Sequence, residues 1–114
     1  MDLAEEVKQI EKELVELIIA HLKGNQIDVE TARQQARDFL ALLPVSDQKD
    51  LLSKLKELGD KYYEAKEIYA EELGKVEEAK RQQTLSQMRD YIQQGNLDSA
   101  IATAKAMYPE KGGN

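Results

Sequence analysis

Residues 60–94 read DKYYEAKEIYAEELGKVEEAKRQQTLSQMRDYIQQ, and apolar side chains recur along them at helical spacing. One face is marked by Tyr62, Ala65, Ile68, Tyr69, Leu73, Val76 and Ala79. Steps of three and four residues predict an amphipathic helix. The other apolar segments of the chain are shorter, and this helix can supply a surface for them to pack against. We therefore expect an all-α fold organised around a long helix at about residues 60–94.

The long helix has two places where it could be interrupted. The apolar spacing passes through Gly59 without a change of phase, so a kinked continuous helix and two separate helices are both open there. Residues 80–84 carry no apolar side chain, and Thr84 with Gln87 fits a capping box that would start a new helix. Gly74 adds local flexibility, because glycine inside a helix costs about 1 kcal/mol relative to alanine. We favour one long helix with a weak point near residues 80–84.

The other helices are delimited by capping residues, glycines and prolines. A first helix is expected over residues 2–23 and ends at Gly24-Asn25, since both residues tolerate the left-handed conformation of a helix stop. Three further helices are expected. The second begins at the N-cap Asp28 and runs to about Leu43, and the third begins at Ser46 or Asp47 and runs to about Leu58. The last begins at Asp98 and runs to about Met107. On the second helix, Ala32 and Ala36 are expected to face the core.

Length and composition indicate one domain. We expect an irregular antiparallel bundle of four to six helices over residues 1–108, followed by a flexible tail at residues 109–114. The longest apolar runs fall far short of the ~20 residues that a membrane-spanning helix needs. The chain begins with acidic residues rather than a signal-peptide pattern and contains no cysteine. These features favour a cytoplasmic protein.

The net charge of −6 is spread along the chain without a basic block. Affinity for nucleic acids comes largely from neutralising phosphates, so we expect no direct binding of nucleic acid. The same reasoning disfavours an anionic membrane surface as a partner. A basic partner protein is compatible with this charge, although solubility is the simpler meaning of an acidic composition.

The side chains that most catalytic and cofactor sites need are missing. His21 is the only histidine and cysteine is absent, so Ser-His or Cys-His catalysis would rest on one residue. No Glu-x-x-His pair of the kind found in carboxylate-bridged metal sites occurs, nor any phosphate-binding loop. His21 falls on the apolar seam of the first helix, which favours a boundary residue with one hydrogen-bonded nitrogen over a catalytic base. We expect no enzyme activity, no metal and no cofactor.

Two kinds of side chain mark a candidate partner surface on the long helix. Tyrosine occurs five times against one phenylalanine, and Tyr62, Tyr63 and Tyr69 lie near the start of this helix. Tyrosine suits interfaces because it combines a large apolar face with a polar tip, but a bundle boundary is the alternative. A row of acidic residues runs along the same helix: Glu64, Glu67, Glu71 and Glu78.

Two turns of the chain are alike, GNQIDVETARQQAR at residues 24–37 and GNLDSAIATAKAM at residues 95–107. They reflect either a diverged duplication or a common solution for a tight helical hairpin. The segment Gly95–Ile101 resembles the turn and second-helix start of a tetratricopeptide repeat. This resemblance covers a short part of the chain, and the 34-residue period of stacked repeats is not seen. It implies a helical hairpin and a role in protein binding.

The sequence thus predicts a non-catalytic helical module for protein–protein interaction, or a subunit that forms a homodimer through an apolar helix face. The alternative is an acidic inhibitor or nucleic-acid mimic that occupies a basic groove of a partner protein. The acidic row motivates that alternative, and such binding would depend steeply on salt. A third hypothesis is a ligand-binding bundle with a pocket near His21.

Overall fold

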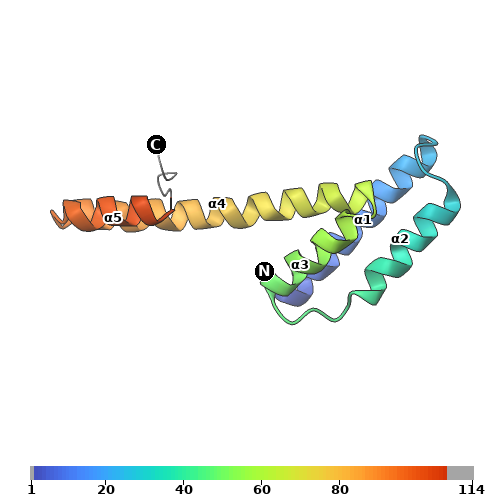
Figure 1. The fold of residues 1–114 in the computed structure, drawn as a ribbon, viewed down its shortest axis with the longest axis horizontal. Coiled ribbons are helices and arrows are strands. Elements are labelled where there is room, and N and C mark those ends of the chain that lie inside the picture. The colour runs from blue at the N-terminus through green and yellow to red at the C-terminus, as the bar shows by residue number, and fades with distance from the viewer. Residues whose placement is uncertain (1, 108–114) are drawn as a thin grey trace, which may run out of the picture. The chain divides into compact units, whose positions relative to one another are not determined.

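The computed structural model describes residues 2–107, which form five α-helices and no strand (Figure 1). In chain order they are α1 (Leu3–Lys23), α2 (Val29–Ala41), α3 (Gln48–Gly59), α4 (Tyr63–Gln93) and α5 (Leu97–Met107). The all-α class and the long helix are confirmed, and α4 runs without a break through residues 80–84. The predicted tail at residues 109–114 lies outside the described residues.

Polar side chains cap the helix starts. The first three helices begin at aspartates that accept a hydrogen bond from the amide three residues further on, at 2.8, 2.7 and 2.7 Å: Asp2, Asp28 and Asp47. Each satisfies one of the free amides of the first helical turn. The open choice between Ser46 and Asp47 is thereby resolved. At α5 the predicted cap Asp98 is wrong, because Asn96 Oδ1 accepts from the Ser99 amide at 3.2 Å and Asp98 lies in the first turn.

The α3–α4 corner depends on Gly59, and it separates the two helices. A Cβ atom at Gly59 would lie 2.9 Å from the Cα of Lys66 and 3.2 Å from its backbone nitrogen. Real Cβ atoms are not found this close to backbone, so a glycine is needed for α4 to pass the end of α3. The kinked continuous helix is therefore excluded, although the apolar spacing runs through the corner unchanged.

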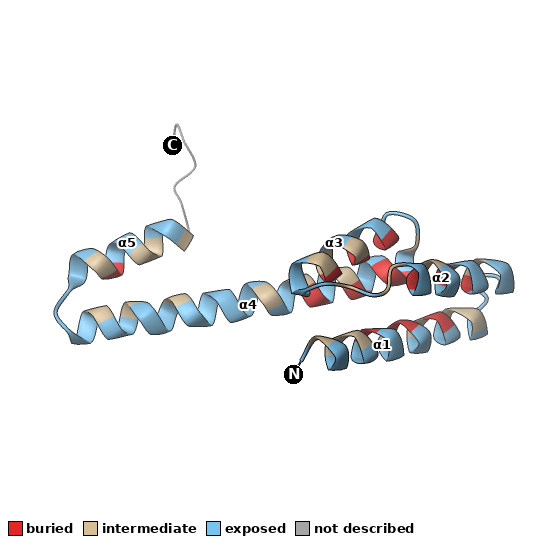
Figure 2. Cartoon of the chain, turned by 90° about the horizontal axis from the view of Figure 1, so that it is seen from below, coloured by how far each residue is buried: buried red, intermediate tan, exposed pale blue. Residues whose placement is uncertain are grey.

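Contacts divide the chain into two compact units after Leu73, whereas the sequence predicts a single domain over residues 1–108. The first unit holds the hydrophobic core, which comprises Ile10, Leu14, Ile18, Ala32, Phe39, Leu51, Leu55, Leu58, Ala65 and Ile68. Figure 2 shows these buried positions on α1, α2, α3 and the start of α4. Burying one such leucine or isoleucine stabilises the fold by about 1.5–3 kcal/mol. This unit therefore has a continuous core, while Val15, Ile19, Val29, Leu40 and Tyr63 remain exposed on its surface.

The second unit consists of the rest of α4 and of α5, which lie side by side (Figure 2). Among residues 74–107, only Ala100 is fully buried. Several large apolar residues of both helices are about half exposed: Leu85, Ile92, Leu97 and Ile101. Two helices alone therefore leave much of their apolar surface in contact with water.

Two glycines of contrasting surroundings test the α3–α4 corner. We expect Gly59→Ala to lower the free energy of unfolding by about 1–3 kcal/mol, because the added methyl group forces the backbone at Lys66 to move. Gly74→Ala is the control, since nothing lies within 4 Å of its added Cβ. That change should raise stability by up to about 1 kcal/mol through helix propensity. Urea unfolding followed by circular dichroism measures both, and equal effects of the two substitutions would contradict the tight corner.

Candidate functional site

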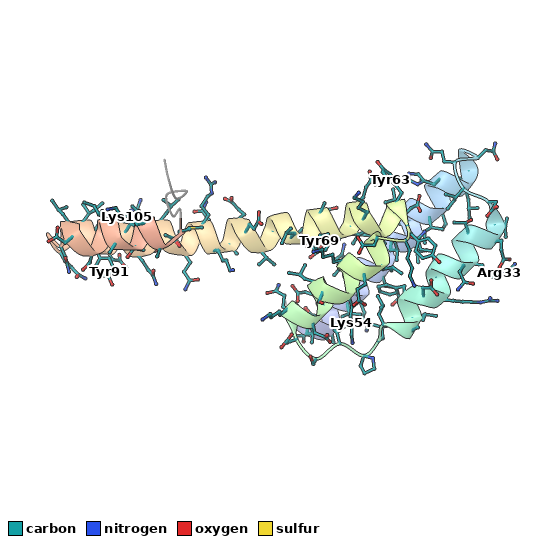
Figure 3. The ribbon with its side chains drawn as sticks, in the orientation of Figure 1. Arg33, Lys54, Tyr63, Tyr69, Tyr91 and Lys105 are labelled. Atoms are coloured by element: carbon teal, nitrogen blue, oxygen red, sulfur yellow. The ribbon has the colours of Figure 1, made fainter. Side chains whose placement is uncertain are left out.

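The tyrosines of the predicted partner surface differ in how far they are buried. Tyr62 and Tyr69 pack partly buried against the core, whereas Tyr63 is 62% exposed at the start of α4 (Figure 3). The Tyr62 hydroxyl donates to Asp38 Oδ2 of α2 at 2.7 Å. This hydrogen bond, with a smaller effect of burial, raises the pKa of Tyr62 to about 12. Tyr62 is therefore a boundary residue that links the start of α4 to α2, whereas the exposed Tyr63 has its ring centroid 6.0 Å from that of His21.

Glu64 was expected in an exposed acidic row, and that prediction is wrong. Its side chain is buried, with the residue only 2% exposed. One carboxylate oxygen, Oε1, accepts from Gln35 Nε2 of α2 at 2.9 Å. The other, Oε2, is hydrogen-bonded to Nδ1 of His21 at the end of α1. The carboxylate of Glu64 thus joins three helices at one point, and we call His21, Gln35 and Glu64 the buried polar network.

Gln35 completes this network and also caps α4. It is fully buried, and its Oε1 accepts from the backbone amide of Ala65 at 3.1 Å. That amide lies in the first turn of α4, where helix amides have no partner within the helix. A side chain from α2 therefore fills the place of a local cap. The negative charge of Glu64 at this same helix start is favoured by the helix dipole.

The charge of the network follows from its hydrogen bonds. Burial by itself raises the pKa of Glu64, but the hydrogen bonds from Gln35 and His21 outweigh it and leave the pKa below its usual value. Both oxygens are engaged and shielded from water. The network therefore holds helices together rather than presenting a reactive group. The expectation that His21 is a boundary residue with one bonded nitrogen is confirmed.

Three buried polar residues escaped the sequence analysis: Gln35, Glu64 and, at 9% exposed, Glu72. On α2 the inward position after Ala32 is Gln35, while the predicted Ala36 is exposed. The apolar pattern points to Ala36, four residues after Ala32, because alanine is apolar. A step of three residues, to Gln35, fits the same helix face equally well. Glu64 precedes the buried Ile68 by four residues and so lies on the same helix face. The four-residue spacing from Ile68 could have identified Glu64 as buried, but a search for apolar residues passes over a glutamate.

The remaining acidic residues are not one row. Glu67 and Glu71 line a cleft of about 380 Å³ in the first unit together with Glu13 and Glu16 of α1, over Leu17 and Ile68. Glu13 Oε2 is buried and accepts no hydrogen bond from any described residue. Glu78 belongs to the second unit, where hydrogen bonds from Arg81 at 3.1 Å lower the pKa of its carboxyl. We call the residues Glu13, Glu16, Glu67 and Glu71 the acid-lined cleft.

A second concave surface lies wholly within the second unit. A groove of about 410 Å³ runs between α4 and α5, and it is lined by Met88, Ile92, Leu97, Ala100, Ile101, Ala104 and Lys105. Six of these seven residues are apolar. Ile92, Leu97 and Ile101 are 54%, 58% and 54% exposed. We call this surface the α4–α5 groove; Lys105, which lines it, is labelled in Figure 3.

Comparisons with family models, with curated proteins and with solved structures give no match to this chain. Within residues 2–107 no helix combines the length and the apolar character needed to cross a membrane. In the same part of the chain, no three acidic or histidine side chains gather in a way that could hold a metal ion.

The buried polar network predicts a defined pH dependence. We expect Glu64→Gln to lower the free energy of unfolding by about 1–3 kcal/mol near neutral pH, because an amide group cannot accept hydrogen bonds at both positions. The pKa of Glu64 is lowered in the folded chain, so its carboxylate stabilises the fold fully above the usual value of 4.5. That contribution is lost as the pH falls through the folded pKa. The difference between the parent and Glu64→Gln should therefore shrink in acid.

The control is Glu67→Gln, one turn away at an exposed position whose Oε1 accepts from the Tyr63 hydroxyl at 3.1 Å. Exposed substitutions of this kind change stability by less than about 0.5 kcal/mol. Urea unfolding at a series of pH values measures both variants. A pH-independent difference for Glu64→Gln, or an equal loss in both variants, would contradict a buried carboxylate at Glu64.

Proposed function

We propose that this chain is a non-catalytic protein-interaction module and that the α4–α5 groove is its docking surface. The observation that carries the proposal is the grouping of half-exposed aliphatic side chains around one groove. Exposed apolar residues are ordinary when they are scattered, but a contiguous patch with a polar rim is typical of an interaction site. The groove meets that description, since apolar residues from both helices line it and charged residues flank it.

The spacing of these side chains suits a helical ligand. Leu85, Met88 and Ile92 follow one another at steps of three and four along α4, and Leu97, Ile101 and Ala104 do so along α5. Two parallel apolar stripes with a groove between them commonly form the binding site for the apolar face of an amphipathic helix. The short resemblance to a tetratricopeptide hairpin falls on the same turn and likewise supports protein binding.

Site-specific photocrosslinking in cells that produce the full chain tests this function. A photoreactive amino acid in place of Ile101 should give a discrete adduct with a protein, either this chain or another, identified by mass spectrometry. The control places the same amino acid at Leu40, which is equally exposed at 59% but lies on α2 of the first unit.

The variant Ile92→Asp should abolish the adduct at position 101, because a carboxylate in an apolar groove disfavours burial by a partner. Circular dichroism establishes that the variant keeps its helices. Absence of an adduct at position 101 beyond that at position 40 would contradict the function, as would an adduct that Ile92→Asp leaves unchanged.

The acid-lined cleft supports a second candidate, an acidic inhibitor or nucleic-acid mimic that binds a basic groove. The favouring observation is the convergence of four carboxylates from α1 and α4 on one cleft, one of whose oxygens lacks a partner among the described residues. Carboxylates held at fixed positions can imitate a row of phosphates toward a basic surface. Such binding is electrostatic and is weakened by salt.

An oligolysine peptide is a suitable probe for this second candidate. A variant with all four cleft glutamates changed to glutamine should bind the peptide more weakly than a matched variant in which Glu5, Glu11, Glu30 and Glu57 are changed. Both variants lose the same charge, so calorimetric titration at low and high salt isolates the effect of position. Equal losses in the two variants, or affinity indifferent to salt, would remove this candidate.

A further inference from the structure

We propose that the occupant of the α4–α5 groove is a second copy of this chain, paired with the first in an antiparallel two-fold arrangement. The inference rests on the proposed interaction function and names its partner. Three features of the groove support it: the positions of opposite charges along the rim, the apolar stripe between them, and the charge balance of the second unit.

The rim charges are placed for self-pairing. Asp98 lies at the end of the groove beside Leu97, where the chain enters α5, and Lys105 lines the groove near its other end. Seven residues separate them, which is about two helical turns or about 10 Å, so both side chains lie on the same side of α5. In an antiparallel two-fold pair, Asp98 of one copy faces Lys105 of the second copy, and the symmetry repeats this contact.

The apolar surface between these charges is self-complementary. Ile101 lies midway between Asp98 and Lys105 and therefore comes close to the two-fold axis, where it meets the same residue of the second copy. Ala100 and Ala104 line the floor of the groove, and their small side chains allow a neighbouring helix to approach closely. Two hairpins joined in this way form a four-helix bundle, which buries the stripes that one hairpin leaves exposed.

Charge balance favours a second copy over a partner of strong charge. The chain as a whole carries a net charge of −6, but acidic and basic residues are nearly balanced in residues 74–107. Two copies can therefore meet through this unit without the repulsion that the acid-rich first unit would cause. A strongly basic partner would instead be attracted to the first unit, where most of the acidic side chains lie.

Sedimentation equilibrium on the purified full chain gives the first test. We expect a reversible monomer–dimer equilibrium, and Ile101→Asp should weaken dimerisation at least about 100-fold, because the substitution puts two carboxylates together at the axis. Ile19→Asp is the control, since Ile19 is also half exposed at 44% but lies on α1 in the first unit. A chain that is monomeric at every concentration would overturn the proposal, as would a dimer that Ile101→Asp leaves intact.

A charge exchange provides the second test and is independent of folding defects in single variants. Asp98→Lys and Lys105→Asp should each weaken the homodimer by about 3- to 30-fold, because like charges then face one another on the rim. An equimolar mixture of the two variants should regain dimers. In a mixed pair, the two positive side chains of the first variant face the two negative side chains of the second across the interface. If the mixture contains no larger fraction of dimer than either variant alone, the antiparallel pairing is contradicted.

The experiments distinguish a failure of self-pairing from a failure of the proposed interaction function. If the full chain is monomeric while a crosslinker at position 101 captures another protein, self-pairing is wrong and the interaction module stands. If the chain is monomeric and position 101 gives no adduct, both are wrong. A dimer whose crosslinks at position 101 join two copies of this chain supports both.

Discussion

The buried carboxylate of Glu64 is the interaction on which the rest of the structure depends. Removing a carboxylate from water is costly unless hydrogen bonds replace those of the solvent. Here His21 of α1 and Gln35 of α2 supply them, and Gln35 also holds the Ala65 amide at the start of α4. Three helices must therefore reach one point in one register. Apolar packing around this point tolerates small shifts, whereas the hydrogen bonds of the network do not.

The chain combines one unit that covers its own core with one that does not. Leu14, Leu55 and Ala65 are almost completely buried in the first unit, whereas only Ala100 reaches that state among residues 74–107. A helical pair with exposed apolar stripes gains stability when a further helix covers them. This contrast is the reason why we propose the α4–α5 groove as the interaction surface.

Much of the fold could be predicted from the sequence because helix periodicity and capping are local properties. The long helix, the Gly24-Asn25 stop and the Asp28 cap all follow from neighbouring residues. The network could not be predicted, since Gln35 and Glu64 are polar and a pattern of apolar residues assigns such positions to solvent. The separation of α3 from α4 also depends on a contact in space, the approach of Lys66 to Gly59. Whether Ile101 is exposed depends on how many neighbouring helices cover it. The periodicity of the sequence does not contain that information.

Amide hydrogen exchange, followed residue by residue at low and high protein concentration, distinguishes the first unit from the α4–α5 groove. We expect the Ala65 amide, held by Gln35 in the first unit, to be protected equally at both concentrations. Amides near Met88 and Ile101 should exchange more slowly as concentration rises, because a second copy then covers the α4–α5 groove. Exchange in residues 85–104 that is independent of concentration would show that no second copy covers the groove.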